Sequence, residues 1–142
     1  MTQDMALLNF IYQNAEMGKE TIPKLTKIVE DVNFRRVLED QLTEYQEIFN
    51  KAEEKIQKEG GDAKGISTME RVSASTMLNL NTLLDKSNTH IAEMMLQGSN
   101  MGIIDADKSL NQCDNMPGKV KTLVEDVKKF EQTSIQKLKS YL

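Results

Sequence analysis

Residues 34–59, FRRVLEDQLTEYQEIFNKAEEKIQKE, carry the pattern that decides the fold. One row of residues in this stretch, spaced by three and four positions, consists of Phe34, Leu38, Gln41, Tyr45, Ile48, Ala52 and Ile56. Because that spacing keeps a row on one side of an α-helix, the stretch predicts a long helix with one buried face. Glu54 and Lys58 lie one turn apart on the outer face, where opposite charges form a favourable pair. Gly60 and Gly61 follow and predict the end of the helix.

The same kind of spacing extends toward the N-terminus and predicts a helix over about residues 3–30. Its inward face consists of Leu8, Ile11, Ala15, Gly18, Ile22, Leu25 and Val29. Pro23 lacks the N–H that would bond to the carbonyl of Lys19, so we expect a kink near residues 18–23.

Three further helices are expected toward the C-terminus, over about residues 67–84, 89–112 and 117–141. Ser67 and Glu70 match a capping box at the start of the first, and Pro117 suits the start of the last. The inward face of 89–112 is predicted as Ile91, Met94, Met95, Gly98, Met101, Gly102, Ala106 and Leu110. That of 117–141 is predicted as Val120, Leu123, Val124, Val127, Phe130, Ile135, Leu138 and Leu142.

Composition narrows the class of protein. A chain of 142 residues suits one domain over 1–142, and seven aromatic residues beside nine Met favour packed helices over a sheet. The net charge of −4 argues against nucleic acid or an anionic membrane as partner. A single cysteine, the lack of a signal-peptide pattern and the lack of an apolar run of about 20 residues favour the cytoplasm.

The order of the helices predicts the topology. Two long helices joined by a short turn come first, two more joined by a short turn come last, and residues 60–87 connect the pairs. Two hairpins joined by one long crossover form the ferritin-like, up-down four-helix bundle. We therefore predict an all-α, ferritin-like bundle whose crossover is helical, with five helices in total. A plain bundle with a fifth packed helix is the alternative.

The chain also resembles the bacterial ferritin-like proteins of unknown function. The resemblance rests on residues 8–24 (LNFIYQNAEMGKETIPK), the Gly60-Gly61 stop, the helical crossover and the restart at Pro117. It implies the bundle fold and is compatible with a homodimer formed through helix faces, with the Met-rich helix 89–112 as a candidate surface.

Ferritin-like di-iron proteins place one Glu on each of two helices and a Glu-x-x-His pair on each of the other two. The positions that could correspond here are Glu16, Glu44, Glu93 and Glu131, with Asp105 as a substitute for Glu93. No Glu-x-x-His pair exists, since the chain offers Gln41-x-x-Glu44, Glu44-x-x-Glu47 and Glu131-x-x-Ser134 instead. This argues against a six-ligand di-iron site, and the ordinary interpretation of these carboxylates is a solvated helix face.

Three positions of the expected middle layer carry neutral polar groups, namely Gln41, Tyr45 and Ser134. Such groups can be satisfied by hydrogen bonds without metal, so we expect the protein to fold fully in the apo form. A Gln within a helix seam is typical of a buried, hydrogen-bonded residue that fixes register.

No catalytic or cofactor-binding constellation is evident. His90, the single histidine, is expected to face solvent or to bond locally in the first turn of its helix, and no sequence cue links it to Cys113. The Met residues at helical spacing are typical of core filler, and the glycine cluster at 60–65 lacks the ending of a phosphate loop.

Two functions follow from these patterns. The first is a non-enzymatic helical binding or structural module without a cofactor. The second is a carboxylate-rich metal-binding protein, either an iron oxidoreductase or a metal store. If Glu16, Glu44, Glu93 and Glu131 converge on one point, the metal hypothesis gains support, and if they scatter outward it loses it.

Overall fold

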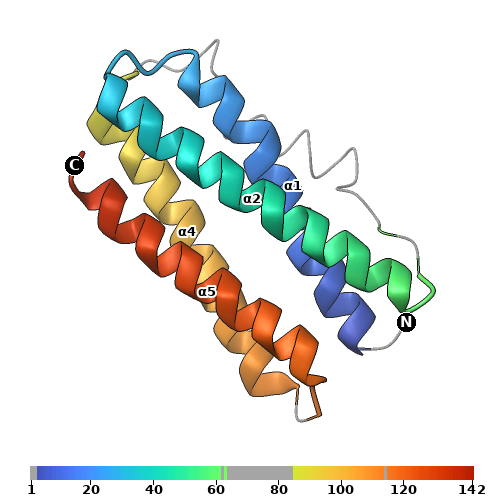
Figure 1. The fold of residues 1–142 in the computed structure, drawn as a ribbon. Coiled ribbons are helices and arrows are strands. Elements are labelled where there is room, and N and C mark those ends of the chain that lie inside the picture. The colour runs from blue at the N-terminus through green and yellow to red at the C-terminus, as the bar shows by residue number, and fades with distance from the viewer. Residues whose placement is uncertain (1–2, 62, 64–84, 114) are drawn as a thin grey trace.

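The chain folds into four long helices that lie side by side (Figure 1). The computed structural model describes residues 3–61, 63, 85–113 and 115–142. Their helices are α1 (Gln3–Thr26), α2 (Val32–Lys58), α4 (Asn88–Gln112) and α5 (Gly118–Lys139). Within this part, 84% of residues are helical and none lies in a strand, which confirms the all-α prediction.

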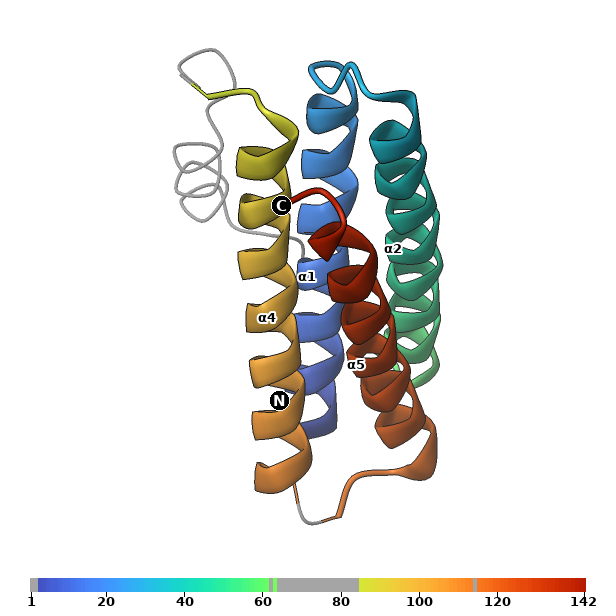
Figure 2. The same ribbon diagram turned by 90° about the vertical axis from the view of Figure 1, so that its left-hand side faces the viewer.

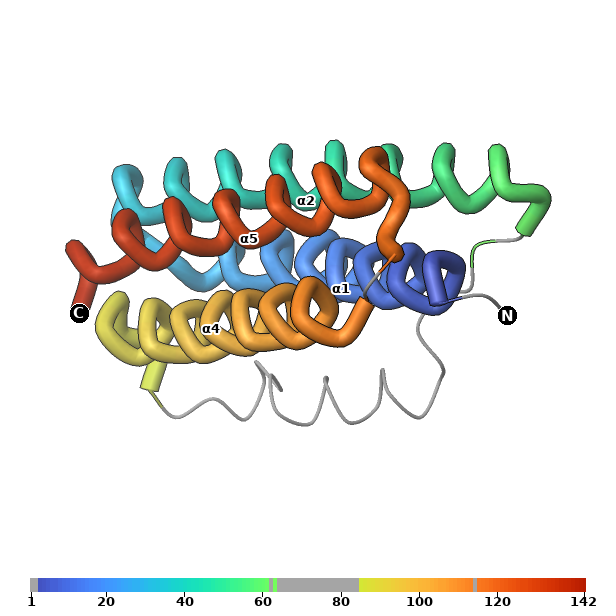
Figure 3. The backbone as a smooth tube through the Cα atoms, turned by 90° about the horizontal axis from the view of Figure 1, so that it is seen from below, coloured from blue at the N-terminus to red at the C-terminus, as the bar shows by residue number. Residues whose placement is uncertain are grey.

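The helices form two antiparallel hairpins, α1 with α2 and α4 with α5 (Figure 2). One end of the bundle is fixed by Asp31, whose Oδ2 accepts a hydrogen bond of 3.3 Å from Asn88 Nδ2. Because Asp31 precedes α2 and Asn88 begins α4, these two helices start at the same end and run in parallel (Figure 3). The connection from α2 to α4 therefore joins opposite ends of the bundle. The helix predicted over 67–84, including its Ser67–Glu70 cap, lies outside the described residues.

The buried face of α2 consists of the seven residues that the sequence pattern predicts. Asp31 caps the helix, since its Oδ1 accepts from the Phe34 backbone N–H at 3.0 Å. The Phe34 ring stacks on Tyr141, with centroids 4.4 Å apart, and closes that end of the core. On the outer face, Lys58 Nζ lies 2.9 Å from Glu54 Oε1, as predicted.

The predicted inward face of α1 is buried except for Gly18, which is half-buried, and the helix also buries Leu7 and Asn9. The helix is continuous through Pro23 and ends at Thr26, four residues before the predicted boundary. Pro23 lies in the last turn, where it donates no backbone bond to the Lys19 carbonyl, and Thr26 Oγ1 donates to the Pro23 carbonyl at 3.0 Å.

The predicted face of α4 is confirmed at Ile91, Gly102 and Ala106 but is wrong at Gly98 and Met101. Its buried residues are Ile91, Ala92, Ser99, Gly102 and Ala106. Gly98 is exposed and Met101 is 54% exposed. The helix has apolar residues on several sides, so composition alone does not fix which side is inward.

The C-terminal helix also corrects the prediction, because polar residues replace apolar ones within its seam. Glu131 and Ser134 are buried, while Ile135 is half-buried and Leu142 is 57% exposed. The remaining buried residues, Val120, Leu123, Val124, Val127 and Leu138, were predicted. No described helix is long and apolar enough to cross a membrane.

Candidate functional site

A group of polar side chains lies buried where the two hairpins meet. We call it the buried polar cluster, and its members are Gln41, Tyr45, Ser99, Glu131 and Ser134. They come from α2, α4 and α5, so the cluster depends on packing between the hairpins. Burial of polar groups is unfavourable unless they are hydrogen-bonded. A buried group of this kind is therefore the first place in the described structure to look for a functional site.

The centre of the cluster is a hydrogen bond between the hairpins. Tyr45 Oη on α2 donates to Glu131 Oε1 on α5 at 2.9 Å, and the contact is buried. The Ser99 side chain on α4 lies beside both groups, since hydrogen bonding by Ser99 opposes the rise in the pKa of Glu131 and in that of Tyr45. Polar side chains from three helices thus meet at one buried carboxyl.

Two glycines make room for this arrangement. A Cβ at Gly18 would lie 2.6 Å from Tyr45 Cδ2, so the Tyr45 ring rests directly on the backbone of α1. A Cβ at Gly102 would lie 3.2 Å from Glu131 Oε1. The tyrosine and the carboxyl group therefore occupy space that larger residues at these two positions would take.

Burial sets the protonation of the cluster. Removal of water raises the pKa of Glu131 to about 7, although the hydrogen bonds from Ser99 and Tyr45 oppose this shift. Burial, together with the neighbouring Glu131, raises the pKa of Tyr45 well above its ordinary value. The Glu131 carboxyl therefore titrates in the neutral range, and the Tyr45 phenol stays protonated there.

Two buried atoms of the cluster lack a hydrogen-bond partner within the described part of the chain, Gln41 Nε2 and Glu131 Oε2. Gln41 and Ser134 also line a groove of about 560 Å³ between α2 and α5. Its rim carries Glu44 and Glu47 from α2 and Lys129 and Lys137 from α5. The groove therefore presents charges of both signs to solvent.

The four candidate metal ligands are not brought together. Glu131 is 1% exposed, Glu16 is half-buried, and Glu44 and Glu93 are exposed. Across residues 3–61, 63, 85–113 and 115–142, no group of three or more His, Cys, Asp or Glu side chains could hold a metal ion. Interpreting Glu131 as a solvated residue was wrong, because the seam of α5 continues through it whatever its polarity.

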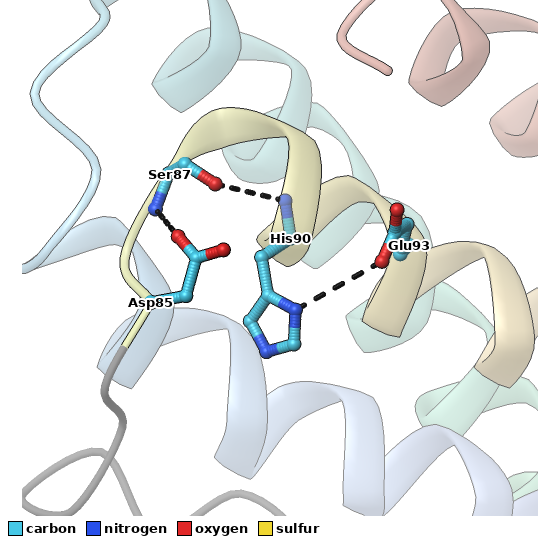
Figure 4. Close-up of polar contacts among 4 residues, drawn as sticks. All are labelled: Asp85, Ser87, His90 and Glu93. Atoms are coloured by element: carbon cyan, nitrogen blue, oxygen red, sulfur yellow. Dashed lines mark hydrogen bonds and ion pairs between the residues drawn. The ribbon is translucent and has the colours of Figure 1, made fainter.

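The single histidine bonds locally, as predicted (Figure 4). Ser87 caps α4, its Oγ accepting from the His90 N–H at 3.2 Å, and Asp85 accepts from the Ser87 N–H. His90 Nδ1 lies 3.9 Å from Glu93 Oε2, one turn along the helix. Cys113 follows the other end of α4, which places it about 35 Å from His90 at 1.5 Å per helical residue. These two residues therefore cannot form a catalytic pair within one chain.

Two members of the cluster escaped the sequence pattern, Ser99 as an inward residue and Glu131 as a buried one. A signal for both exists in the spacing. Val124, Val127, Glu131, Ser134 and Leu138 continue one seam, and Ser99 lies seven residues after Ala92 and before Ala106. For these two residues, the position within the three-and-four spacing of the seam predicts burial better than the residue type does.

Comparisons of the chain with protein-family models, curated proteins and solved structures found no match.

Proposed function

We propose that this protein is a non-enzymatic, ferritin-like helical bundle that serves as a binding or structural module. In this proposal a hydrogen-bonded cluster takes the place of a di-metal centre. The observation that carries it is the pairing of Glu131 with the hydroxyl groups of Tyr45 and Ser99. These groups satisfy one carboxyl in the core, whereas a di-metal site needs several convergent carboxylates.

The ferritin-like part of the proposal is supported by connectivity. The helices α2 and α4 run in parallel and are joined from opposite ends, which is the arrangement that one long crossover produces. We further propose that residues 67–84 form the crossover helix, as their Ser67–Glu70 cap predicts. Backbone NMR chemical shifts of the full chain should be helical over this range, and coil values there would contradict the proposal.

The donor set does not fit a di-iron centre. Glu44 and Glu93 are exposed on different hairpins, and the buried Glu131 already accepts a hydrogen bond from the Tyr45 hydroxyl. Hydroxyl groups of Ser and neutral Tyr are weak ligands for iron compared with carboxylate and imidazole. Among the four candidate ligands only Glu131 is fully buried, so a metal there would find one carboxyl instead of several.

The metal hypothesis is tested by thermal unfolding with and without Fe(II) or Mn(II). We expect the melting temperature of the apo protein to change by less than about 1 °C. A site of micromolar Kd at a hundredfold excess of metal would add about 2.7 kcal/mol, which corresponds to several degrees for a domain of this size.

Two variants and one control show which residues are responsible for any rise of the melting temperature with metal. A rise of several degrees that Glu131→Gln or Glu16→Ala abolishes, and that Glu39→Gln leaves unchanged, would favour the metal-binding function over the module. Glu39 lies on the exposed face of α2 and is a matched control for the loss of one carboxylate.

A further inference from the structure

A small hollow opens between α1 and α4 and reaches inward to the buried polar cluster. Its volume is about 110 Å³, and Tyr45 and Ser99 lie at its inner end. Met17 on α1 and Met94 and Met95 on α4 form much of its wall. It is distinct from the charged groove between α2 and α5.

Two glycines border this hollow. Gly18 leaves room for the Tyr45 ring, and that ring becomes part of the wall. At Gly98, no described atom outside the local helix lies within 4 Å of the position that a Cβ would take. Gly18 thus lets the Tyr45 ring form part of the wall, and Gly98 leaves space open beside it.

The lining determines what chemistry the hollow could bind. None of the described residues that line it is charged, and its polar groups are the side chains of Asn14, Thr21 and Ser99. Thioethers and an aromatic ring give favourable contacts to a planar apolar ring. An engineered apolar cavity of about 150 Å³ binds benzene, so a hollow of this size suits a single ring.

Ser99, at the inner end of the hollow, determines which kind of hydrogen bond a ligand could form there. Its single hydroxyl hydrogen faces the Glu131 carboxyl and the Tyr45 hydroxyl, which leaves its oxygen lone pairs as acceptors. A ligand hydroxyl at the inner end would therefore donate to Ser99 Oγ.

We propose that this hollow binds a compact, uncharged molecule of one six-membered ring that carries a hydroxyl group. The proposal rests on the binding-module function given above and supplies its ligand class. It is independent of the metal test, because a structural bundle without a ligand would pass that test and fail the one below.

The test uses the full chain with ¹³C-labelled Met methyl groups, titrated with phenol and followed by NMR. Ring currents should shift the methyl signals of Met17, Met94 and Met95 along one saturable curve. Met101, on the exposed side of α4, is the internal control and should not follow that curve. Benzoate, which has the same ring with a negative charge, should bind at least about tenfold more weakly than phenol.

A filling variant then assigns the binding to the hollow. Gly98→Leu should weaken phenol binding by at least about tenfold, because the new side chain competes for the space. Gly118→Leu is the matched control, since a Cβ there also meets no described atom within 4 Å and the position lies at the start of α5. Circular dichroism verifies that both variants are folded.

Three results would overturn the proposal. They are linear, non-saturating shifts of all methionines, benzoate binding as tight as phenol binding, and phenol binding that Gly98→Leu leaves intact.

Discussion

Glu131 lies in a core built mainly from aliphatic side chains, and its carboxyl group loses most of its hydration there. The hydroxyl groups of Tyr45 and Ser99 replace part of that hydration. Its second oxygen has no partner in the described part of the chain, so the ionised form is stabilised less than it would be in water. Protonation therefore follows from local geometry rather than from neighbouring charges.

This residue should make stability depend on pH. The pKa of Glu131 rises from its ordinary value of 4.5 to about 7 on folding, so the folded protein binds the proton more tightly. The contribution of Glu131 to the free energy of unfolding should be highest below pH 4.5, fall as the pH rises to about 7, and level off above. At 1.36 kcal/mol per pKa unit, the total loss is about 3 kcal/mol.

Urea unfolding between pH 4.5 and 8.5 measures this effect. Glu131→Gln should remove the part of the pH dependence that comes from Glu131. It should be more stable than the natural protein at pH 8, because it buries no ionised carboxylate. The exposed Glu39→Gln serves as the control and should keep the natural slope. Parallel pH profiles for the natural protein and Glu131→Gln would contradict the prediction.

Two glycines of the hollow should respond to alanine in opposite directions. In Gly18→Ala the new Cβ would meet the Tyr45 ring at 2.6 Å, so we expect a loss of about 1–3 kcal/mol from overpacking. In Gly98→Ala the Cβ has open space, and the better helix propensity should add about 0.5–1 kcal/mol. Equilibrium urea unfolding of both variants tests the pair, and a change of the same sign in both would contradict it.

For each helix, the accuracy of the predicted buried face depends on how clearly the apolar residues are separated from the charged residues around the helix. The α2 face was predicted completely because charged residues surround its seam on both sides. The α4 face was predicted only in part, because the helix carries apolar residues on its exposed side as well, such as Met101 at 54% and Ile104 at 45% exposure. In α5, Ile135 was predicted inward from its residue type, but the seam runs from Val127 through Glu131 and Ser134 to Leu138, which leaves Ile135 half-buried.

Loss of the N-cap side chain of α2 should destabilise the protein more than loss of the N-cap side chain of α4. Asp31 accepts from the Phe34 N–H within its own helix start and from Asn88 of the other hairpin. Asp31→Ala loses both bonds, and we expect a cost of about 1–2 kcal/mol. Ser87→Ala loses one exposed bond of 3.2 Å to the His90 N–H and should cost about 1 kcal/mol or less. Thermal unfolding at constant pH compares the two variants, and a larger loss for Ser87→Ala would disprove this ranking.

For the whole molecule, the prediction of a homodimer through helix faces can now be placed on residues. Met101 and Ile104 lie one turn apart on the exposed side of α4, where a second copy could cover them. We expect light scattering at high micromolar concentration to give twice the chain mass, and Met101→Lys to give the mass of one chain. A clean monomer for the natural protein under these conditions would remove the prediction.

The all-helical architecture and the two hairpins could be predicted from local spacing, whereas the buried polar cluster could not. Helix periodicity concerns neighbours within a few turns, but Tyr45 and Glu131 are 86 positions apart. Gln41, Tyr45 and Ser134 were expected in the middle layer from their seam positions. Their meeting with Ser99 and Glu131 depends on how the hairpins dock, which no pattern within one helix specifies.

That separation along the chain has a consequence for the order in which the protein is made. The hairpin of α1 and α2 is complete before α5 has been synthesised, and its helices can pair as a local unit. At about 5–20 residues per second, the ribosome needs roughly 4–17 s to add the residues between Tyr45 and Glu131. During this interval the Tyr45 hydroxyl cannot form its hydrogen bond to Glu131, because Glu131 has not yet been added to the chain. The bond between them thus forms only after the second hairpin has been added to the chain.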